Sequence, residues 1–62
     1  MDLNNYATMD PVMLMSIVNM KLRDEFDSLE DLVRYYDIDK AVLCTRLEEA
    51  GFTYIEDANQ FR

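Results

Sequence analysis

The segment from residue 10 to residue 25 is apolar on most sides if it forms a helix. At about 100° per residue its apolar side chains spread over an arc of about 220°. Those side chains are Met13, Leu14, Met15, Ile17, Val18, Met20 and Leu22. The narrow polar stripe that remains consists of Ser16, Asn19 and Arg23. The Asp10-Pro11 pair predicts the start of this first helix, because aspartate accepts from the free amides of the first turn and proline loses no hydrogen bond there.

Two shorter helices are predicted over residues 28–36 and 39–50. Ser28 and Asp31 form a capping-box-like pair at the start of one, and Asp39 can cap the other. Gly51 follows the last helix, where a left-handed residue is commonly needed. Apolar residues recur at helical spacing in both segments, namely at Leu29, Leu32, Val33 and Tyr36 and then at Leu43, Leu47 and Ala50.

The two ends of the chain have different sequence patterns. Residues 1–9 are a leader without periodicity, which can place Leu3 and Tyr6 on the core. Residues 52–62 alternate briefly around a turn, with Asn59 as the residue that best accepts a positive φ. The predicted fold is therefore a single domain over residues 1–62 of the mainly α class. It is a three-helix, helix-turn-helix-like bundle with a short C-terminal extended or β-hairpin segment.

The first helix carries more apolar surface than two partners cover, because packing against them accounts for about 100° to 150° of its arc. In one interpretation the leader and the tail cover the surplus, the tail through Tyr54, Ile55 and Phe61. In the other, part of the arc stays bare and forms a dimer or peptide-binding surface. The candidate interaction face is then Met13, Ile17 and Met20, and methionine suits such adaptable surfaces.

Residues 28–52 also place apolar side chains where a helix-turn-helix motif needs them, although Val33 and Asp37 depart from its small and glycine positions. Nucleic-acid contacts through Lys40, Thr45 and Arg46 are the alternative function. Neighbouring acids and a net charge of −7 oppose it, because contacts with phosphate dominate such affinity. A nucleic-acid partner is therefore not expected, and the motif is interpreted as a way to pack two short helices.

Composition narrows the possible chemistry. The chain has no histidine and one cysteine, Cys44, so neither an internal disulfide nor a zinc site is expected. The acidic cluster before and within the second helix lacks the spacing and the glycine of an EF-hand, and its charge suits a helix start. We expect no enzyme activity, no catalytic residue, no cofactor or metal and no small-molecule substrate. Without an export signal or a membrane span, a cytoplasmic location is expected.

Three stretches of the sequence resemble a known family. They are "DPVMLMSIVNMKLRDEF", "SLEDLVRYYDIDKAVLCTRLEEAGFTY" and the closing "NQF". They are similar to short bacterial proteins grouped as domain of unknown function 4250, over essentially the whole chain. The resemblance implies a bacterial, cytosolic, stand-alone domain and supplies no activity, cofactor or catalytic residue. It draws attention to Ser16, Asn19, Lys21 and Arg23, the polar members of the first stretch, as a candidate functional surface. We expect instead that Asn19 and Arg23 bind backbone carbonyls or acids of the second helix region such as Asp27 and Glu30.

The leading hypothesis is a small non-catalytic interaction domain that pairs with itself or with a protein partner through the first helix. The alternative is a degenerate helix-turn-helix domain that contacts nucleic acid.

Overall fold

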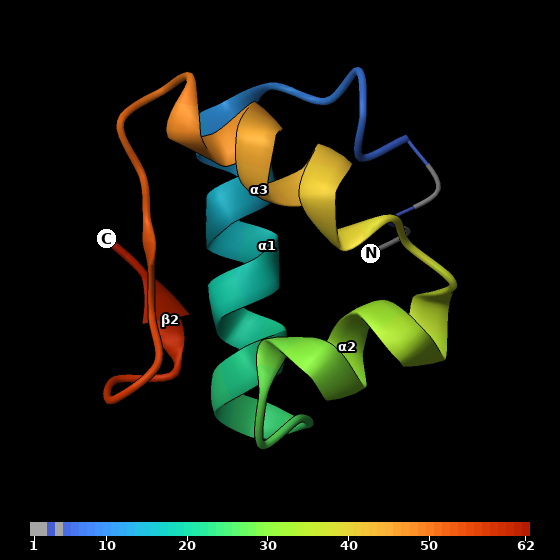
Figure 1. Cartoon of the computed structure of the whole chain (residues 1–62), viewed down its shortest axis with the longest axis vertical. Coiled ribbons are helices and arrows are strands. Elements are labelled where there is room, and N and C mark those ends of the chain that lie inside the picture. The colour runs from blue at the N-terminus through green and yellow to red at the C-terminus, as the bar shows by residue number, and fades with distance from the viewer. Residues whose placement is uncertain (1–2, 4) are drawn as a thin grey trace.

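Helix α1, Pro11–Asp24, is the element on which the rest of the chain packs. The computed structural model describes residue 3 and residues 5–62. It contains α2, Leu29–Tyr36, α3, Lys40–Glu48, and the two strands β1, Tyr54–Ile55, and β2, Gln60–Phe61. Figure 1 shows the hairpin along one side of α1, with α3 crossing the upper part of α1 and α2 leading away from its lower end. The mainly α, three-helix fold with a C-terminal hairpin is confirmed.

The helix starts follow the predicted capping chemistry. The Asp10 carboxylate accepts from the Met13 amide at 3.1 Å, and the Ser28 hydroxyl accepts from the Asp31 amide at 3.2 Å. Asp39 caps α3 through the amides of residues 41 and 42. Each helix thus begins where its side chains satisfy amides that lack a partner within the helix.

Positive φ angles occur at the chain reversals. Gly51 follows the end of α3 with φ +90°, and Asn59 in the hairpin turn has φ 52°, both as the sequence predicts. Asp37 takes φ 55° between α2 and α3, although glycine is the more usual residue there. Aspartate is one of the few residues with a side chain that adopts this region readily, so the short turn forms without glycine.

The hairpin has a fixed register, with Tyr54 opposite Phe61 and Ile55 opposite Gln60. Thr53 and Arg62 exchange two backbone hydrogen bonds, of 2.8 and 3.0 Å. In antiparallel strands, residue pairs that exchange backbone hydrogen bonds alternate with pairs that do not. Because Thr53 and Arg62 form a hydrogen-bonded pair, the next pair does not, and the amide and carbonyl of Phe61 point away from β1.

Both ends of the chain contribute to one core. Leu3 from the leader and Phe61 from β2 are buried, and Tyr6 and Met9 pack against the core. Residues 1, 2 and 4 of the predicted leader lie outside the described residues. The remaining buried apolar side chains are Leu14, Ile17, Val18, Leu22, Leu29, Leu32, Val33, Ile38, Leu43 and Leu47.

The leader and the tail cover the apolar surplus of α1 only in part. Phe61 is 2% exposed, and Tyr54 packs against the core. Ile55, which was expected to help cover α1, is 39% exposed instead, because it alternates to the outer side of its strand. A further part of α1 remains open to solvent.

Candidate interaction surfaces

The open part of α1 is an apolar strip formed by Val12, Met13 and Met20, which we call the methionine face. These side chains are 55%, 51% and 43% exposed. Ser16 lies between them, and its hydroxyl donates to the Val12 carbonyl at 3.0 Å. Because that hydroxyl already has a partner within the helix, the strip presents little free hydrogen-bonding capacity and is suited to apolar contacts.

The structure divides the predicted interaction face of Met13, Ile17 and Met20. Ile17 is only 5% exposed and belongs to the core. On an α-helix it lies about 40° from Met13, turned toward the buried Lys21, and this small rotation is enough to cover it. Val12 joins the face in its place. It projects close to the polar stripe, so the apolar arc read from the sequence did not include it.

Asn19, from the predicted polar stripe, binds the hairpin. Its side-chain nitrogen donates to the Phe61 carbonyl at 3.0 Å, and its oxygen accepts from the Phe61 amide at 2.8 Å. The amide side chain therefore takes the place of a neighbouring strand along the outer edge of β2. This satisfies the prediction that the side chain binds a backbone carbonyl.

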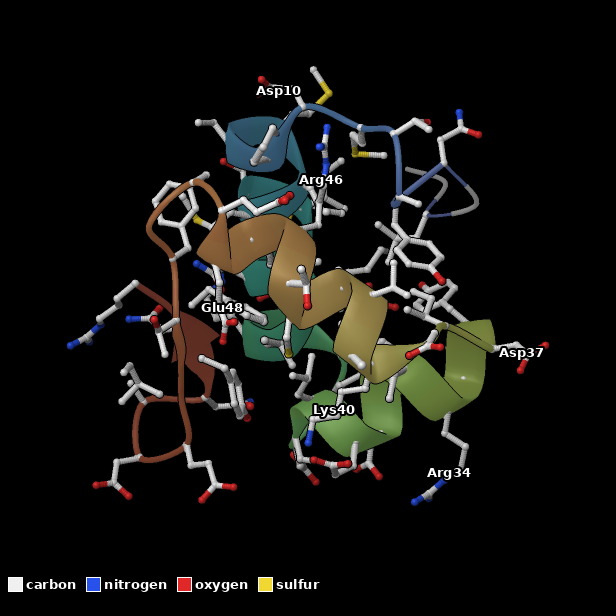
Figure 2. The ribbon with its side chains drawn as sticks, turned by 45° about the horizontal axis from the view of Figure 1, so that its top comes forward. Asp10, Arg34, Asp37, Lys40, Arg46 and Glu48 are labelled. Carbon is white, nitrogen blue, oxygen red and sulfur yellow. The ribbon has the colours of Figure 1, made fainter. Side chains whose placement is uncertain are left out.

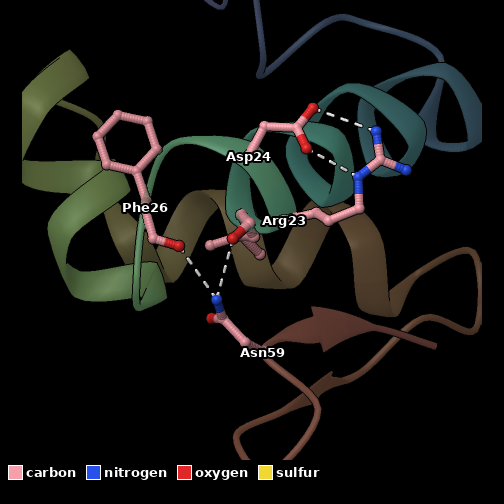
Figure 3. Close-up of polar contacts among 5 residues, drawn as sticks. Arg23, Asp24, Phe26 and Asn59 are labelled. Atoms are coloured by element: carbon pink, nitrogen blue, oxygen red, sulfur yellow. Dashed lines mark hydrogen bonds and ion pairs between the residues drawn. The ribbon is translucent and has the colours of Figure 1, made fainter.

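Arg23, at the end of the same stripe, forms a different contact. Its guanidinium donates to both carboxylate oxygens of Asp24, at 2.9 and 3.1 Å (Figure 3). The guanidinium lowers the pKa of Asp24, and the carboxylate raises the pKa of Arg23. Both side chains are exposed, so this pair stabilises the fold little and stays on the surface.

Asn59 joins the hairpin turn to the end of α1. Its side-chain nitrogen donates to the carbonyls of Leu22 and Phe26, each at 3.1 Å (Figure 3). Its oxygen accepts from the Tyr54 hydroxyl at 2.7 Å, and the Tyr54 oxygen accepts from the Leu29 amide at 3.3 Å. One side chain thus satisfies carbonyls at the end of α1 and, through Tyr54, connects to the start of α2. The sequence signalled the turn but not these contacts.

A polar hollow of about 400 Å³ lies between the end of α1 and the hairpin turn, with Arg23, Asp24, Asp27 and Asn59 among its lining residues. The paired Arg23 and Asp24 and the hydrogen-bonded nitrogen of Asn59 already have partners within the chain. The hollow is therefore best understood as a seam between two elements.

Lys21 is a charged residue on the core side of α1, and it is 7% exposed. Its ammonium group lies 5.2 Å from the centre of the Tyr36 ring and 3.6 Å from Glu25. Tyr36 and Glu25 raise the pKa of Lys21, so the group stays protonated. The stem packs along the core while the charge finds an aromatic and an acidic partner, as expected of a long amphipathic side chain.

The residues of the nucleic-acid alternative all belong to α3 but project from different sides of it, and the two cations already have partners. The Lys40 ammonium pairs with Glu30. Arg46 donates from Nε and Nη2 to the Met9 carbonyl, at 3.1 and 2.8 Å, which fastens the leader to α3 (Figure 2). Thr45 is exposed. A phosphate would have to displace both partners, so the geometry gives this alternative no support.

Cys44 lies on α3, half-buried beside the core. Burial raises the pKa of its thiol, although Lys40 acts in the opposite direction. A thiol that resists ionisation is a poor nucleophile and behaves as a small apolar side chain.

Two further findings concern metal sites and membranes. In the part of the chain that the structure describes, no three acidic, cysteine or histidine side chains come together in a group able to hold a metal ion. Over the same residues, none of the helices combines the length and the apolar character needed to cross a bilayer.

Comparison with known proteins identifies the family of this chain. No curated protein and no solved structure matches the chain significantly. The model of one family, described as a domain of unknown function (DUF4250), matches residues 8–61. This range holds all three helices, the hairpin, and both asparagines that fasten the hairpin to α1. The chain therefore belongs to the DUF4250 family.

Proposed function

We propose that this chain is a non-catalytic protein-interaction domain that associates with a second copy of itself through the methionine face. The observation that carries the proposal is the exposure of Val12, Met13 and Met20 on a helix whose other apolar side chains are largely covered. Methionine side chains are flexible and polarisable, so they adapt to an opposing apolar surface with little demand on its shape.

The extent of the face predicts a weak dimer. A stable interface covers about 800 Å² on each partner. For a chain with 4012 Å² of accessible surface this is about a fifth of the total, well beyond three partly exposed side chains. We therefore expect dissociation constants in about the high-micromolar to millimolar range.

The non-catalytic part of the proposal is supported by the state of the reactive side chains. The single thiol has a raised pKa. Lys21 has a raised pKa beside Tyr36 and Glu25, and Lys40 has a raised pKa beside Glu30. Groups held in these states are poor nucleophiles or bases near neutral pH.

Sedimentation equilibrium over a wide concentration range tests the association. Met20→Lys should remove the concentration dependence of the apparent mass, because it places a charge within the apolar contact. Val42→Lys is the matched control, since Val42 is 41% exposed on α3 and Met20 is 43% exposed on α1. An apparent mass that stays monomeric at every concentration in the parent chain would refute the proposal.

A further inference from the structure

The methionine face carries two thioether side chains that are open to solvent. Met13 and Met20 are 51% and 43% exposed, and both belong to α1. The interval between them is nearly two turns of an α-helix, so the two side chains project from the same side of α1, about 10 Å apart along its axis. A small reagent that reaches this side of the helix therefore meets both sulfur atoms.

The other methionines that the structure describes are covered. Met9 and Met15 pack against the core. The Met15 sulfur also accepts a hydrogen bond from the side-chain nitrogen of Asn19, at 3.1 Å, which engages one of its lone pairs. The sulfur atoms of the described residues thus form two classes, one open on the methionine face and one shielded beside the leader and the hairpin.

A thioether reacts with a peroxide through a lone pair on sulfur. The lone pair attacks one oxygen of hydrogen peroxide, the O–O bond breaks, and the sulfur-bound hydroxyl gives its proton to the hydroxide that leaves. The products are a sulfoxide and water, so sulfur loses two electrons and the peroxide gains them. Because the peroxide and the water that assists the proton transfer must both reach the sulfur, the rate follows exposure.

Cys44 is the other sulfur that a peroxide could attack. It is half-buried on α3, and burial raises the pKa of its thiol. The thiolate is the reactive form, so little of it is present near neutral pH. This lowers the reactivity of Cys44 and leaves the methionine face as the most accessible oxidisable surface of the described residues.

We infer that Met13 and Met20 are paired oxidation sites, and that a peroxide converts the methionine face from an apolar to a polar surface while the fold stays intact. A sulfoxide oxygen is a hydrogen-bond acceptor that is unfavourable to bury against apolar groups. On the open face it stays in water, so the packing of α1 is not disturbed.

The consequence for association rests on the proposed function. Two oxidised copies should no longer pair through the methionine face, because each would bury sulfoxide oxygens without donors. Methionine sulfoxide reductases reduce the two epimers of the sulfoxide, so the change is reversible.

Site selectivity is tested in the full chain with Cys44→Ser, at about 10 μM, where a weak dimer is dissociated. Hydrogen peroxide is added in excess, and sulfoxide at each methionine is followed by peptide mass spectrometry. Met13 and Met20 should oxidise about tenfold faster than Met9 and Met15, and the rates should converge in urea. A chain oxidised only at Met13 and Met20 should unfold at the same urea concentration as the untreated chain.

Sedimentation equilibrium up to about 1 mM tests the consequence for association. Peroxide should remove the concentration dependence of the apparent mass, and treatment with both classes of reductase should restore it. The double variant Met13→Leu, Met20→Leu keeps an apolar face without sulfur, so its association should not respond to peroxide. The matched control Met9→Leu, Met15→Leu should lose its association on oxidation, as the parent chain does.

Four results would overturn the inference. They are oxidation of Met9 or Met15 as fast as that of Met13 and Met20, a lower urea midpoint once Met13 and Met20 are oxidised, association of the parent chain that survives this oxidation, and equal loss of association by the two double variants. A parent chain that stays monomeric at every concentration would refute the proposed self-association instead, and the oxidation rates and the urea midpoint would still decide the oxidation sites.

Discussion

Two neighbouring sides of α1 differ in whether the chain covers them: the side that faces the hairpin is covered, and the methionine face is open. On the hairpin side, Phe61 is buried and its backbone is held by Asn19. On the methionine face, Met13 and Met20 remain open to solvent. Apolar character alone does not distinguish the two sides. The two sides differ because the side chain of Asn19 binds the backbone of the covering strand on one side only.

A hairpin can lie against a helix only if its outer edge finds hydrogen-bond partners. The backbone groups of α1 are bonded within the helix, so they cannot pair with a strand. Asn19 supplies one donor and one acceptor from a side chain, and these satisfy the amide and the carbonyl of Phe61. Two residues of strand are then enough to cover that side of the helix. The methionine face offers no comparable partner, and the chain leaves it open.

The largest expected effect comes from removing the apolar part of this contact. Phe61→Ala should lower the free energy of unfolding by about 3–5 kcal/mol, because it leaves a cavity against α1. A domain of this length has a total stability of only about 3–9 kcal/mol, so much of the population should unfold. Ile55→Ala removes the exposed residue of the same hairpin and should cost less than about 1 kcal/mol. Urea unfolding followed by circular dichroism measures both, and equal losses would contradict the packing described here.

The second prediction removes the polar part alone. Asn19→Ala should lower the free energy of unfolding by about 2 kcal/mol, because two backbone groups of Phe61 lose their partners. Ser16→Ala is the control in the same polar stripe and should change it by no more than about 0.5 kcal/mol, since the Ser16 hydroxyl bonds only within its helix. Should the two variants unfold at the same urea concentration, the hydrogen bonds of Asn19 would not be what fastens the hairpin.

The third prediction tests the turn that brings β2 to Asn19. Asn59→Gly keeps a residue that accepts a positive φ but removes the hydrogen bonds to Leu22, Phe26 and Tyr54. It should cost about 1–2 kcal/mol of unfolding free energy. A stability equal to that of the parent chain would show that only the backbone conformation of this residue matters.

The smallest expected effect is a difference in the reactivity of a thiol between a covered and an exposed position. The raised pKa of Cys44 means that its thiolate is scarce at pH 8 and becomes abundant only as the pH rises above the ordinary value of 9.0. A thiol introduced by Met20→Cys, in a chain that also carries Cys44→Ser, should react with iodoacetamide about tenfold faster at pH 8 than Cys44 does in the parent chain. In urea the two rates should converge. Equal rates in the folded chains would contradict the difference in burial.

Local rules predicted the elements well, because their causes lie within a few residues. Asp10, Ser28 and Asp39 cap the helices, and Gly51 and Asn59 take the reversals that the sequence assigned to them. Each of these roles depends on short-range backbone chemistry, which is visible in the order of the residues.

The long-range contacts that determine which surfaces are covered could not be predicted from the sequence in the same way. Asn19 and Phe61 are 42 residues apart, and Arg46 and Met9 are 37 apart. Nothing local distinguishes a polar residue that binds a distant backbone from one that faces water. Ile17 was likewise assigned to the open face, because a rotation of about 40° on the helix decides its burial. Such differences depend on where the neighbouring elements come to lie.

The accessibility of the methionine methyl groups to a dissolved paramagnetic chelate tests most directly whether α1 keeps an open face that associates. At about 10 μM we expect strong relaxation of the Met13 and Met20 methyl signals and weaker relaxation of Met15, which packs against the core. At about 1 mM, Met13 and Met20 should become protected while Met15 stays unchanged. Two results would contradict an open face that associates. One is protection of the Met13 and Met20 methyl groups already at the lower concentration, and the other is relaxation of these methyl signals that does not change between the two concentrations.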